Sequence, residues 1–172
     1  MKILLIRHGE TTDNLKDILQ GHRPGVLSDL GIKQAHERGE KMLGMKIDYI
    51  VSSDLQRSID TADILNKYIK TERRIEPLLK EKDWGSLTGK SISYYYAGDF
   101  PDDIENDQQL YNRASKLIKK LRKEYSNNTI VLLGHGAINV AIKAIFMGID
   151  ADNMMQEIPI QNNLDLWEWE DK

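Results

Sequence analysis

The stretch Ile3-Leu4-Leu5-Ile6-Arg7-His8-Gly9-Glu10 decides the fold of this chain and indicates its chemistry. A continuous apolar run is typical of a central strand that is buried on both faces, and we expect one over Lys2–Ile6. Such a strand delivers Arg7 and His8 together to its carboxyl end. A neutral imidazole can attack phosphorus, and a guanidinium offers a planar fork of donors that matches phosphate oxygens. This pair of side chains therefore predicts a phosphate site.

Strand and helix patterns alternate along the rest of the chain. This alternation predicts an α/β fold, a three-layer sandwich in which a mostly parallel central sheet carries helices on both faces. After the first strand we expect a loop over Asn14–Leu27, a helix over Ser28–Met42 with Ser28 as N-cap, and a strand over Asp48–Val51. Two further helices are predicted from apolar residues that share one face, the first with Leu55, Ile59, Ala62, Leu65 and Ile69 and the second with Leu110, Ala114, Leu117, Leu121 and Tyr125. A strand over Thr129–Leu133, a helix over Ala137–Met147 and an edge strand over Leu164–Trp169 are expected to follow.

The pattern breaks down between Glu76 and Asp107, where glycines, tyrosines and clustered acidic residues replace it. Irregular segments of this length in a compact domain often serve as lids. We therefore expect one domain over residues 1–172, with a lid excursion at about residues 85–107. The run Tyr94-Tyr95-Tyr96 is predicted either to contact the organic part of a substrate or to clamp the lid onto the core.

The composition excludes several classes of function. With 172 residues, 40% of them hydrophobic and 30% charged, the chain has the length and composition of one globular domain. Its net charge of -3 argues against a nucleic-acid partner. Cysteine is absent, which rules out disulfides, thiolate metal sites and a cysteine nucleophile. No apolar run has the length of a signal peptide or a membrane span, so we expect no membrane partner and a cytoplasmic location.

Three strand ends carry residues suited to phosphate chemistry. Arg7 and His8 follow the first strand, Arg57 follows Ser52-Ser53, and His135 follows the strand over Thr129–Leu133. Ligands of parallel sheets bind beyond the carboxyl ends of the strands. Because Gly136 begins a helix there, its free backbone amides are expected to favour an anion in the same space. The remaining histidines lack this placement: His36 is predicted to be a solvated helix residue and His22 to line the mouth of the cleft.

These motifs resemble those of the histidine phosphatase superfamily, also called phosphoglycerate mutase-like, over most of the chain. The resemblance rests on Arg7-His8-Gly9-Glu10-Thr11-Thr12-Asp13-Asn14, on Ser52-Ser53-Asp54-Leu55-Gln56-Arg57 with Thr61-Ala62, on Leu79-Lys80-Glu81-Lys82-Asp83-Trp84-Gly85 and on Gly134-His135-Gly136. The loop Gly21-His22-Arg23-Pro24-Gly25-Val26-Leu27 departs from the family, which often has Asp and Pro there and Trp in place of His22. These departures leave the residues of the phosphoryl pocket unchanged.

The resemblance implies a role for each matching residue. His8 would become phosphohistidine, Glu81 would serve as general acid and then as general base, and Glu10 would have a structural or capping role. Phosphoryl oxygens would be held by Arg7, Arg57 and His135. Other substrate contacts would come from Asn14, from the amides near Gln20 and Gly21, and from Gly136. A hydrogen bond from the second ring nitrogen of His8 to a backbone carbonyl, such as that of Gly9, would fix its tautomer.

The predicted function is hydrolysis of small phosphomonoesters without a cofactor. The main alternative is a phosphoglycerate mutase or related phosphotransferase, but the short interval between Glu81 and His135 is acidic and lacks the tandem arginines of that branch. A noncatalytic module that binds phosphorylated ligands is a further alternative.

A metal-dependent hydrolase is also conceivable from the sequence, with His8, Asp13, Glu81 and His135 as ligands. The two arginines beside the site would repel a cation, so we expect no metal. Trp167 and Trp169 alternate with glutamates on the last strand. One face of this strand is therefore predicted to pack on the core, with a homodimer interface as the alternative.

Overall fold

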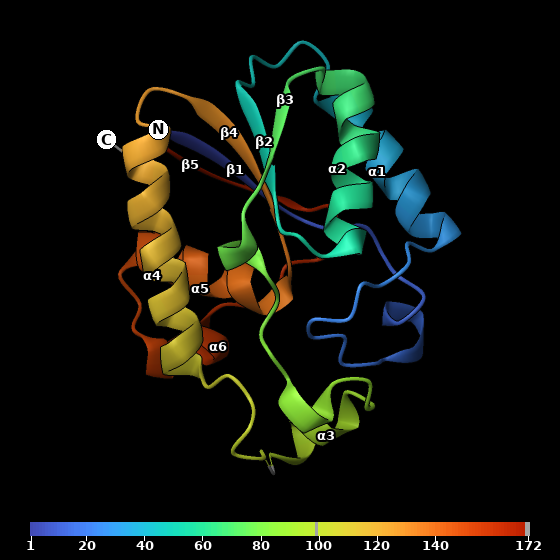
Figure 1. The fold of residues 1–172 in the computed structure, drawn as a ribbon, viewed down its shortest axis with the longest axis vertical. Helices are drawn as coiled ribbons and strands as arrows, with labels where there is room; N and C mark the ends of the chain where they lie inside the picture. The colour runs from blue at the N-terminus through green and yellow to red at the C-terminus, as the bar shows by residue number, and fades with distance from the viewer. Residues whose placement is uncertain (99, 171–172) are drawn as a thin grey trace.

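The computed structural model describes residues 1–98 and 100–170. Figure 1 shows strands at the centre of the molecule and helices on both sides of them. The elements are β1 (Lys2–Arg7), η1 (Asn14–Lys16), α1 (Asp29–Lys41), β2 (Tyr49–Ser52), α2 (Gln56–Ile69), β3 (Glu72–Ile75), η2 (Pro77–Leu79), η3 (Gly85–Leu87), α3 (Ser93–Ala97), α4 (Asp107–Glu124), β4 (Thr129–Gly134), α5 (Gly136–Met147), α6 (Ala151–Glu157) and β5 (Leu166–Glu170), where η marks a 3₁₀ helix.

The sheet has the strand order β3-β2-β4-β1-β5. The pairs β1–β4, β2–β4 and β2–β3 are parallel, whereas β5 pairs with β1 in the antiparallel direction at the edge. The predicted α/β class, the mostly parallel sheet and the last edge strand are confirmed. The strand β3 was not predicted, because its residues Glu72-Arg73-Arg74-Ile75 show no continuous or alternating apolar pattern. The helices α3 and α6, which are short, were not predicted either.

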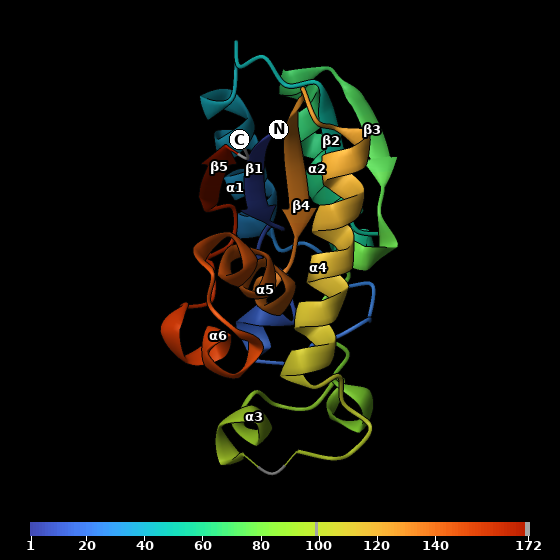
Figure 2. The same ribbon diagram turned by 90° about the vertical axis from the view of Figure 1, so that its left-hand side faces the viewer.

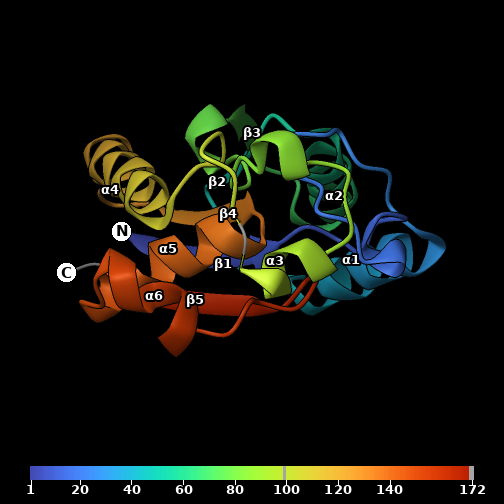
Figure 3. The same cartoon turned by 90° about the horizontal axis from the view of Figure 1, so that it is seen from below.

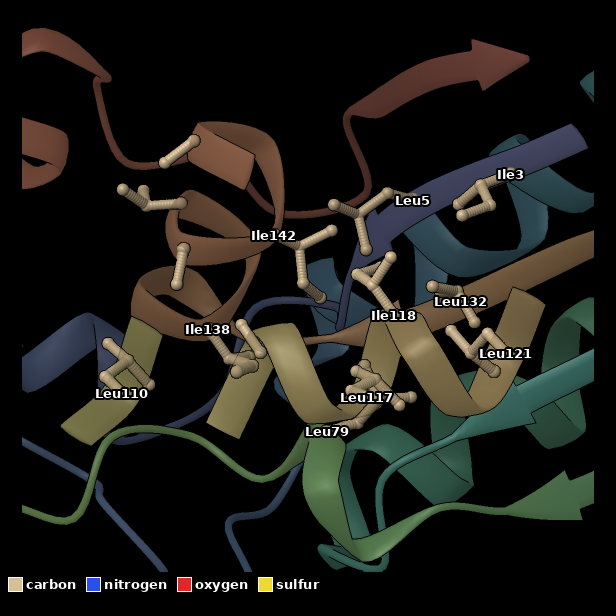
Figure 4. Close-up of a cluster of buried hydrophobic side chains, with 14 of the residues drawn as sticks. Ile3, Leu5, Leu79, Leu110, Leu117, Ile118, Leu121, Leu132, Ile138 and Ile142 are labelled. Atoms are coloured by element: carbon tan, nitrogen blue, oxygen red, sulfur yellow. The ribbon is translucent and has the colours of Figure 1, made fainter. Parts of the chain in front are cut away.

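Two apolar layers cover the two faces of the sheet. Alternate strand residues point to opposite faces, so neighbours along one strand enter different layers. One layer packs against α4 and α5 and includes Ile3, Leu5, Val51, Ile130 and Leu132 (Figure 4). The other packs against α1 and α2 and includes Leu4, Ile6, Ile50, Val131 and Leu133. Figure 2 shows the sheet between these two groups of helices, which confirms the three-layer arrangement.

Side-chain caps begin the helices α1 and α4. The Ser28 hydroxyl accepts a hydrogen bond from the Gly31 amide at the start of α1, as predicted. At the start of α4, the Asn106 side chain accepts from the Gln109 amide and the Gln109 side chain accepts from the Asn106 amide. This reciprocal capping box explains why α4 begins where the acidic segment ends.

The excursion before α4 packs against the first loop of the chain. Backbone hydrogen bonds join Leu19 to Lys90 and to Gly89, and Ile92 to Asp17. Leu19, Trp84 and Leu87 form a small separate apolar cluster, and Tyr95 packs against it. Seen from below, α3 lies across the end of the sheet at which β1 and β4 finish (Figure 3). The excursion therefore forms a wall beyond the carboxyl ends of the strands.

The tryptophans of β5 pack on the core. Trp167 pairs with Leu5 and Trp169 with Ile3 across the antiparallel ladder, and both contact the layer that contains α4 and α5. Trp169 also stacks on Phe146, with ring centroids 5.4 Å apart. The prediction that one face of this strand packs on the core is confirmed.

Candidate active site

Three neighbouring strands bring the candidate residues together at their carboxyl ends. Where β1 pairs with β4, the His8 amide donates to the Gly134 carbonyl at 3.2 Å, which aligns His8 with the end of β4. The Ser53 amide donates to the Leu133 carbonyl at 3.2 Å, which places the end of β2 on the other side of β4. His135 follows Gly134 directly. As a result, the rings of His8 and His135 lie with their centroids 5.0 Å apart.

Hydrogen bonds define the tautomers of both histidines. The carbonyl of Gly9 can only accept, so the His8 Nδ1 that lies 2.7 Å from it carries the proton, as predicted. The Nε of Arg57 donates to Nε2 of His8 and to Nδ1 of His135, each at 3.2 Å. His135 therefore carries its proton on Nε2, which lies 2.6 Å from the Ser53 hydroxyl. The lone pair on Nε2 of His8 thus faces the guanidinium of Arg57.

Both imidazoles are held in the neutral form. The pKa of His8 lies well below its usual value, because the ring is buried and because Arg57 and Arg7 oppose a second positive charge. Burial also lowers the pKa of His135 strongly, and Arg57 lowers it further. A neutral ring with an unprotonated Nε2 is the form of histidine that can act as a nucleophile.

Two arginines, Arg57 buried and Arg7 partly buried, give the site its positive charge. Arg57 is 1% exposed, and its Nη1 and Nη2 donate to the carbonyls of Arg23 and Gly21 at 2.6 and 3.0 Å. Burial lowers its pKa to about 10, so it stays charged at neutral pH. Nη1 of Arg7 donates to the Gln161 carbonyl, while its buried Nε has no hydrogen-bond partner. A buried cation with an unused donor is suited to an anionic ligand.

Glu81 occupies the amino end of α5. Its Oε1 accepts hydrogen bonds from the amides of Ala137 and Ile138 at 3.0 and 3.3 Å. The amides at this helix end were predicted to be free for a substrate anion, and for Ala137 and Ile138 that prediction is wrong, because both already donate to Glu81. Among the described residues no hydrogen bond is made to Oε2 of Glu81, which leaves this oxygen for proton transfer.

A cavity of about 150 Å³ opens above these groups. Of the predicted site residues, seven line it: Arg7, His8, Asn14, Gln20, Arg57, Glu81 and Gly136. The rest of its lining is largely apolar and comes from Ile18, Leu19, Trp84, Ile92, Tyr95, Tyr96, Ala137, Met155 and Ile160. No sequence pattern pointed to Met155 or Ile160. Met155 lies in α6, which was not predicted, and Ile160 follows it.

Two predicted substrate contacts lie outside the cavity wall. His135 is fully buried behind His8, and Gly21 directs its carbonyl to Arg57, so neither lines the cavity. Glu10 has the structural role predicted for it, because its carboxylate accepts from the Ser28 hydroxyl at 2.7 Å.

The other two histidines also differ from His8 and His135 in their surroundings. His36 is half-buried, and its Nδ1 lies 2.7 Å from the Tyr68 hydroxyl, so the prediction of a solvated residue is wrong. His22 does not line the cavity of the site but lines a neighbouring one, and its Nε2 donates to the Glu81 carbonyl.

Within residues 1–98 and 100–170, no three His, Asp or Glu side chains are grouped so as to hold a metal ion. None of the helices in these residues combines the length and the apolar character that crossing a bilayer requires.

The fold and this arrangement of histidines and arginines correspond to a known family. The family model described as histidine phosphatase superfamily (branch 1) matches residues 3–168. The chain therefore belongs to the histidine phosphatase superfamily, and the predicted membership is confirmed.

Relatives and solved structures agree with this assignment. An uncharacterized phosphatase, PhoE, from Bacillus subtilis is 30% identical over 153 residues, which cover 87% of this chain and 79% of PhoE. A metal-independent phosphoserine phosphatase from Arabidopsis thaliana is 30% identical over 165 residues, covering 86% of this chain and 68% of that protein. The structure of a mycobacterial glucosyl-3-phosphoglycerate phosphatase superposes with a TM-score of 0.85 and 23% identity, covering 97% of this chain and 88% of that one. Its fold is shared.

Proposed function

We propose that the protein is a phosphomonoesterase that hydrolyses small phosphorylated substrates through a phosphohistidine on His8, with Glu81 as general acid and base. One observation carries the proposal. The His8 ring is buried and neutral, its Nδ1 is tied to the Gly9 carbonyl, and its Nε2 lone pair faces the Arg57 guanidinium at the floor of a cavity. This geometry suits attack on a phosphorus atom whose oxygens lie against two arginines.

In the first step, Nε2 of His8 forms a bond to phosphorus while the bond from phosphorus to the ester oxygen breaks. Arg7 and Arg57 stabilise the charge on the phosphoryl oxygens in the transition state. The leaving oxygen takes a proton from Oε2 of Glu81 and departs as the alcohol.

In the second step, water replaces the alcohol and attacks the phosphohistidine. Glu81, now ionised, takes a proton from this water as its oxygen bonds to phosphorus. The bond between phosphorus and Nε2 breaks, and its electron pair returns to His8. The products are inorganic phosphate and a site in its starting state, so one carboxyl group serves both steps.

The lining of the cavity favours a phosphatase over a mutase. A phosphoglycerate mutase must also hold a second phosphate or a carboxylate, which requires further cations. The only Lys or Arg side chains among the described residues that line this cavity are Arg7 and Arg57. The wall contributed by Trp84, Ile92 and Tyr95 is apolar, so it suits a small organic group attached to one phosphate. Relatives named as phosphatases support the same reading.

The test is a rapid acid-free quench of the protein mixed with small phosphomonoesters, followed by mass spectrometry of the intact chain. We expect an acid-labile phosphoryl adduct on the wild type and on His36→Gln, but none on His8→Gln. His36 is a matched control because it lies outside the cavity. Free phosphate should appear from several esters. The proposal fails if His8→Gln turns over at the wild-type rate, or if 3-phosphoglycerate is isomerised only when 2,3-bisphosphoglycerate is present.

A further inference from the structure

The segment that carries Glu81 has no regular secondary structure of its own. Residues 80–84 lie between η2 and η3 and belong to neither a helix nor a strand. Helices and strands position a side chain through their own backbone hydrogen bonds, whereas an irregular segment depends on contacts from elsewhere. Within the segment the Lys82 amide donates to Oε1 of Glu81 at 2.9 Å, but the position of the segment itself must be set by groups outside it.

Arg113 of α4 binds this stretch of backbone, as does the ring of His22, whose Nε2 donates to the Glu81 carbonyl at 2.9 Å. Nη1 of Arg113 donates to the carbonyls of Leu78 and Lys80 at 2.9 and 2.7 Å, and its Nη2 donates to the carbonyl of Glu81 at 3.2 Å. One guanidinium thus binds three carbonyls, one in η2 and two in the segment. This uses the planar fork of arginine, which a lysine ammonium does not reproduce.

Glu105 holds the guanidinium in place and extends the contact. Its carboxylate accepts from Nε and Nη2 of Arg113 at 2.8 and 2.6 Å, a bidentate pair in which the two side chains are 18% and 14% exposed. The same carboxylate accepts from the Asp83 amide at 3.1 Å, and the Glu105 amide donates to the Asp83 carbonyl at 2.8 Å. The pair therefore holds the segment on both sides of Glu81.

We propose that Arg113, held by Glu105, is a positioning residue that directs Oε2 of Glu81 toward the leaving oxygen of the substrate. Arg113 fixes the Glu81 backbone, and the amides of Ala137 and Ile138 fix its Oε1, so the remaining oxygen has a defined direction. This inference rests on the proposed function. Arg113 itself lines a separate cavity, not the one that contains His8, so it does not touch the substrate.

A misplaced general acid has a specific kinetic signature. Benzyl phosphate releases an alkoxide, which requires a proton as the ester bond breaks. 4-Nitrophenyl phosphate has a ring of similar size but releases a stable phenolate, which leaves without one. General acid catalysis contributes about 100-fold or more to rate. The value of kcat/KM reports steps up to the first irreversible one, so it isolates phosphoryl transfer to His8 from the later attack by water.

The experiment compares kcat/KM for these two esters in the wild type, Arg113→Gln, Arg113→Lys, Glu81→Gln and Lys116→Gln. We expect Arg113→Gln to reduce the value for benzyl phosphate about 100-fold and that for 4-nitrophenyl phosphate less than about 3-fold. Arg113→Lys should show the same selectivity, because it keeps the charge but not the fork. Lys116→Gln removes a charge from the exposed side of the same helix and should change neither value.

The outcomes separate this inference from the proposed function. If Glu81→Gln lowers kcat/KM for both esters equally, Glu81 is not the general acid and the proposed function fails. If Glu81→Gln is selective but the two Arg113 variants are not, only the positioning role is wrong. Thermal unfolding of each variant is measured alongside. A loss of folded protein lowers the apparent kcat/KM for both esters by the same factor and leaves the ratio of the two values unchanged. An unchanged ratio in both Arg113 variants therefore refutes the inference.

Discussion

The two neutral, buried histidines predict how the stability of the protein depends on pH. The pKa values of His8 and His135 lie well below the usual value in the folded chain, chiefly because of burial and then because of Arg57. On unfolding, both rings return to a pKa of about 6.5. Below that pH the unfolded chain binds more protons than the folded chain, so the free energy of unfolding falls as the pH falls.

The magnitude follows from the linkage relation. Between pH 6 and pH 5, a histidine that stays neutral in the folded state and has a pKa of about 6.5 in the unfolded state removes about 1.2 kcal/mol from the free energy of unfolding. His8 and His135 together remove about 2.4 kcal/mol. Because typical domains are stable by about 5–15 kcal/mol, this is a measurable share of the total.

The assay is urea unfolding at pH 6 and pH 5 of the wild type, His8→Gln and Asn14→Ala. Carboxylates contribute to the pH dependence of all three proteins, so the comparison uses the difference between variants. Over this interval, the free energy of unfolding of His8→Gln should fall by about 1.2 kcal/mol less than that of the wild type. Asn14→Ala changes a residue of the same cavity that does not titrate, and it should behave like the wild type. Equal losses in His8→Gln and the wild type would show that His8 is protonated in the folded protein.

Two further predictions concern the phosphate site. Hydrolysis of phosphomonoesters should survive prolonged treatment with EDTA, because Arg7 and Arg57 oppose a cation beside His8; loss of activity that a divalent metal restores would contradict this mechanism. Arg57→Lys should lower kcat/KM about 100-fold for both benzyl and 4-nitrophenyl phosphate, since a lysine cannot bond His8 and still reach the carbonyls that hold Arg57. Steady-state kinetics measure this, and a loss confined to benzyl phosphate would contradict it.

The strand ends of the site were predictable from the sequence because each follows a strong apolar run. β1 and β4 carry continuous runs of buried residues, so their ends at Arg7 and Gly134 are well defined. A parallel sheet then places Arg7, His8 and His135 at one edge without any knowledge of loops. The same argument placed Arg57, which follows Ser52-Ser53, at this edge, and the structure has it in the first turn of α2.

The contacts that complete the site were not predictable, because they depend on long-range packing of irregular segments. The first loop and the excursion are joined by single backbone hydrogen bonds, such as Leu19 to Lys90, that no local pattern encodes. The apolar wall at Met155 and Ile160 depends on the short helix α6, which no sequence pattern predicted. The expectation of free amides at α5 failed for a related reason: periodicity locates a helix end but not the distant carboxylate of Glu81 that occupies it.

Arg57 and Arg113 show how the partners of an arginine decide its role. Both are largely buried and both donate to backbone carbonyls. Arg113 is also paired with the carboxylate of Glu105, which balances its charge and leaves it to hold a segment of backbone. The side chain of Arg57 donates to carbonyls and to imidazole nitrogens, so its charge is not balanced by a hydrogen-bonded anion. Together with burial, that charge lowers the pKa of His8 and keeps its ring neutral. The same charge is available to a phosphoryl group, so Arg57 both prepares the nucleophile and is positioned to bind the group that it attacks.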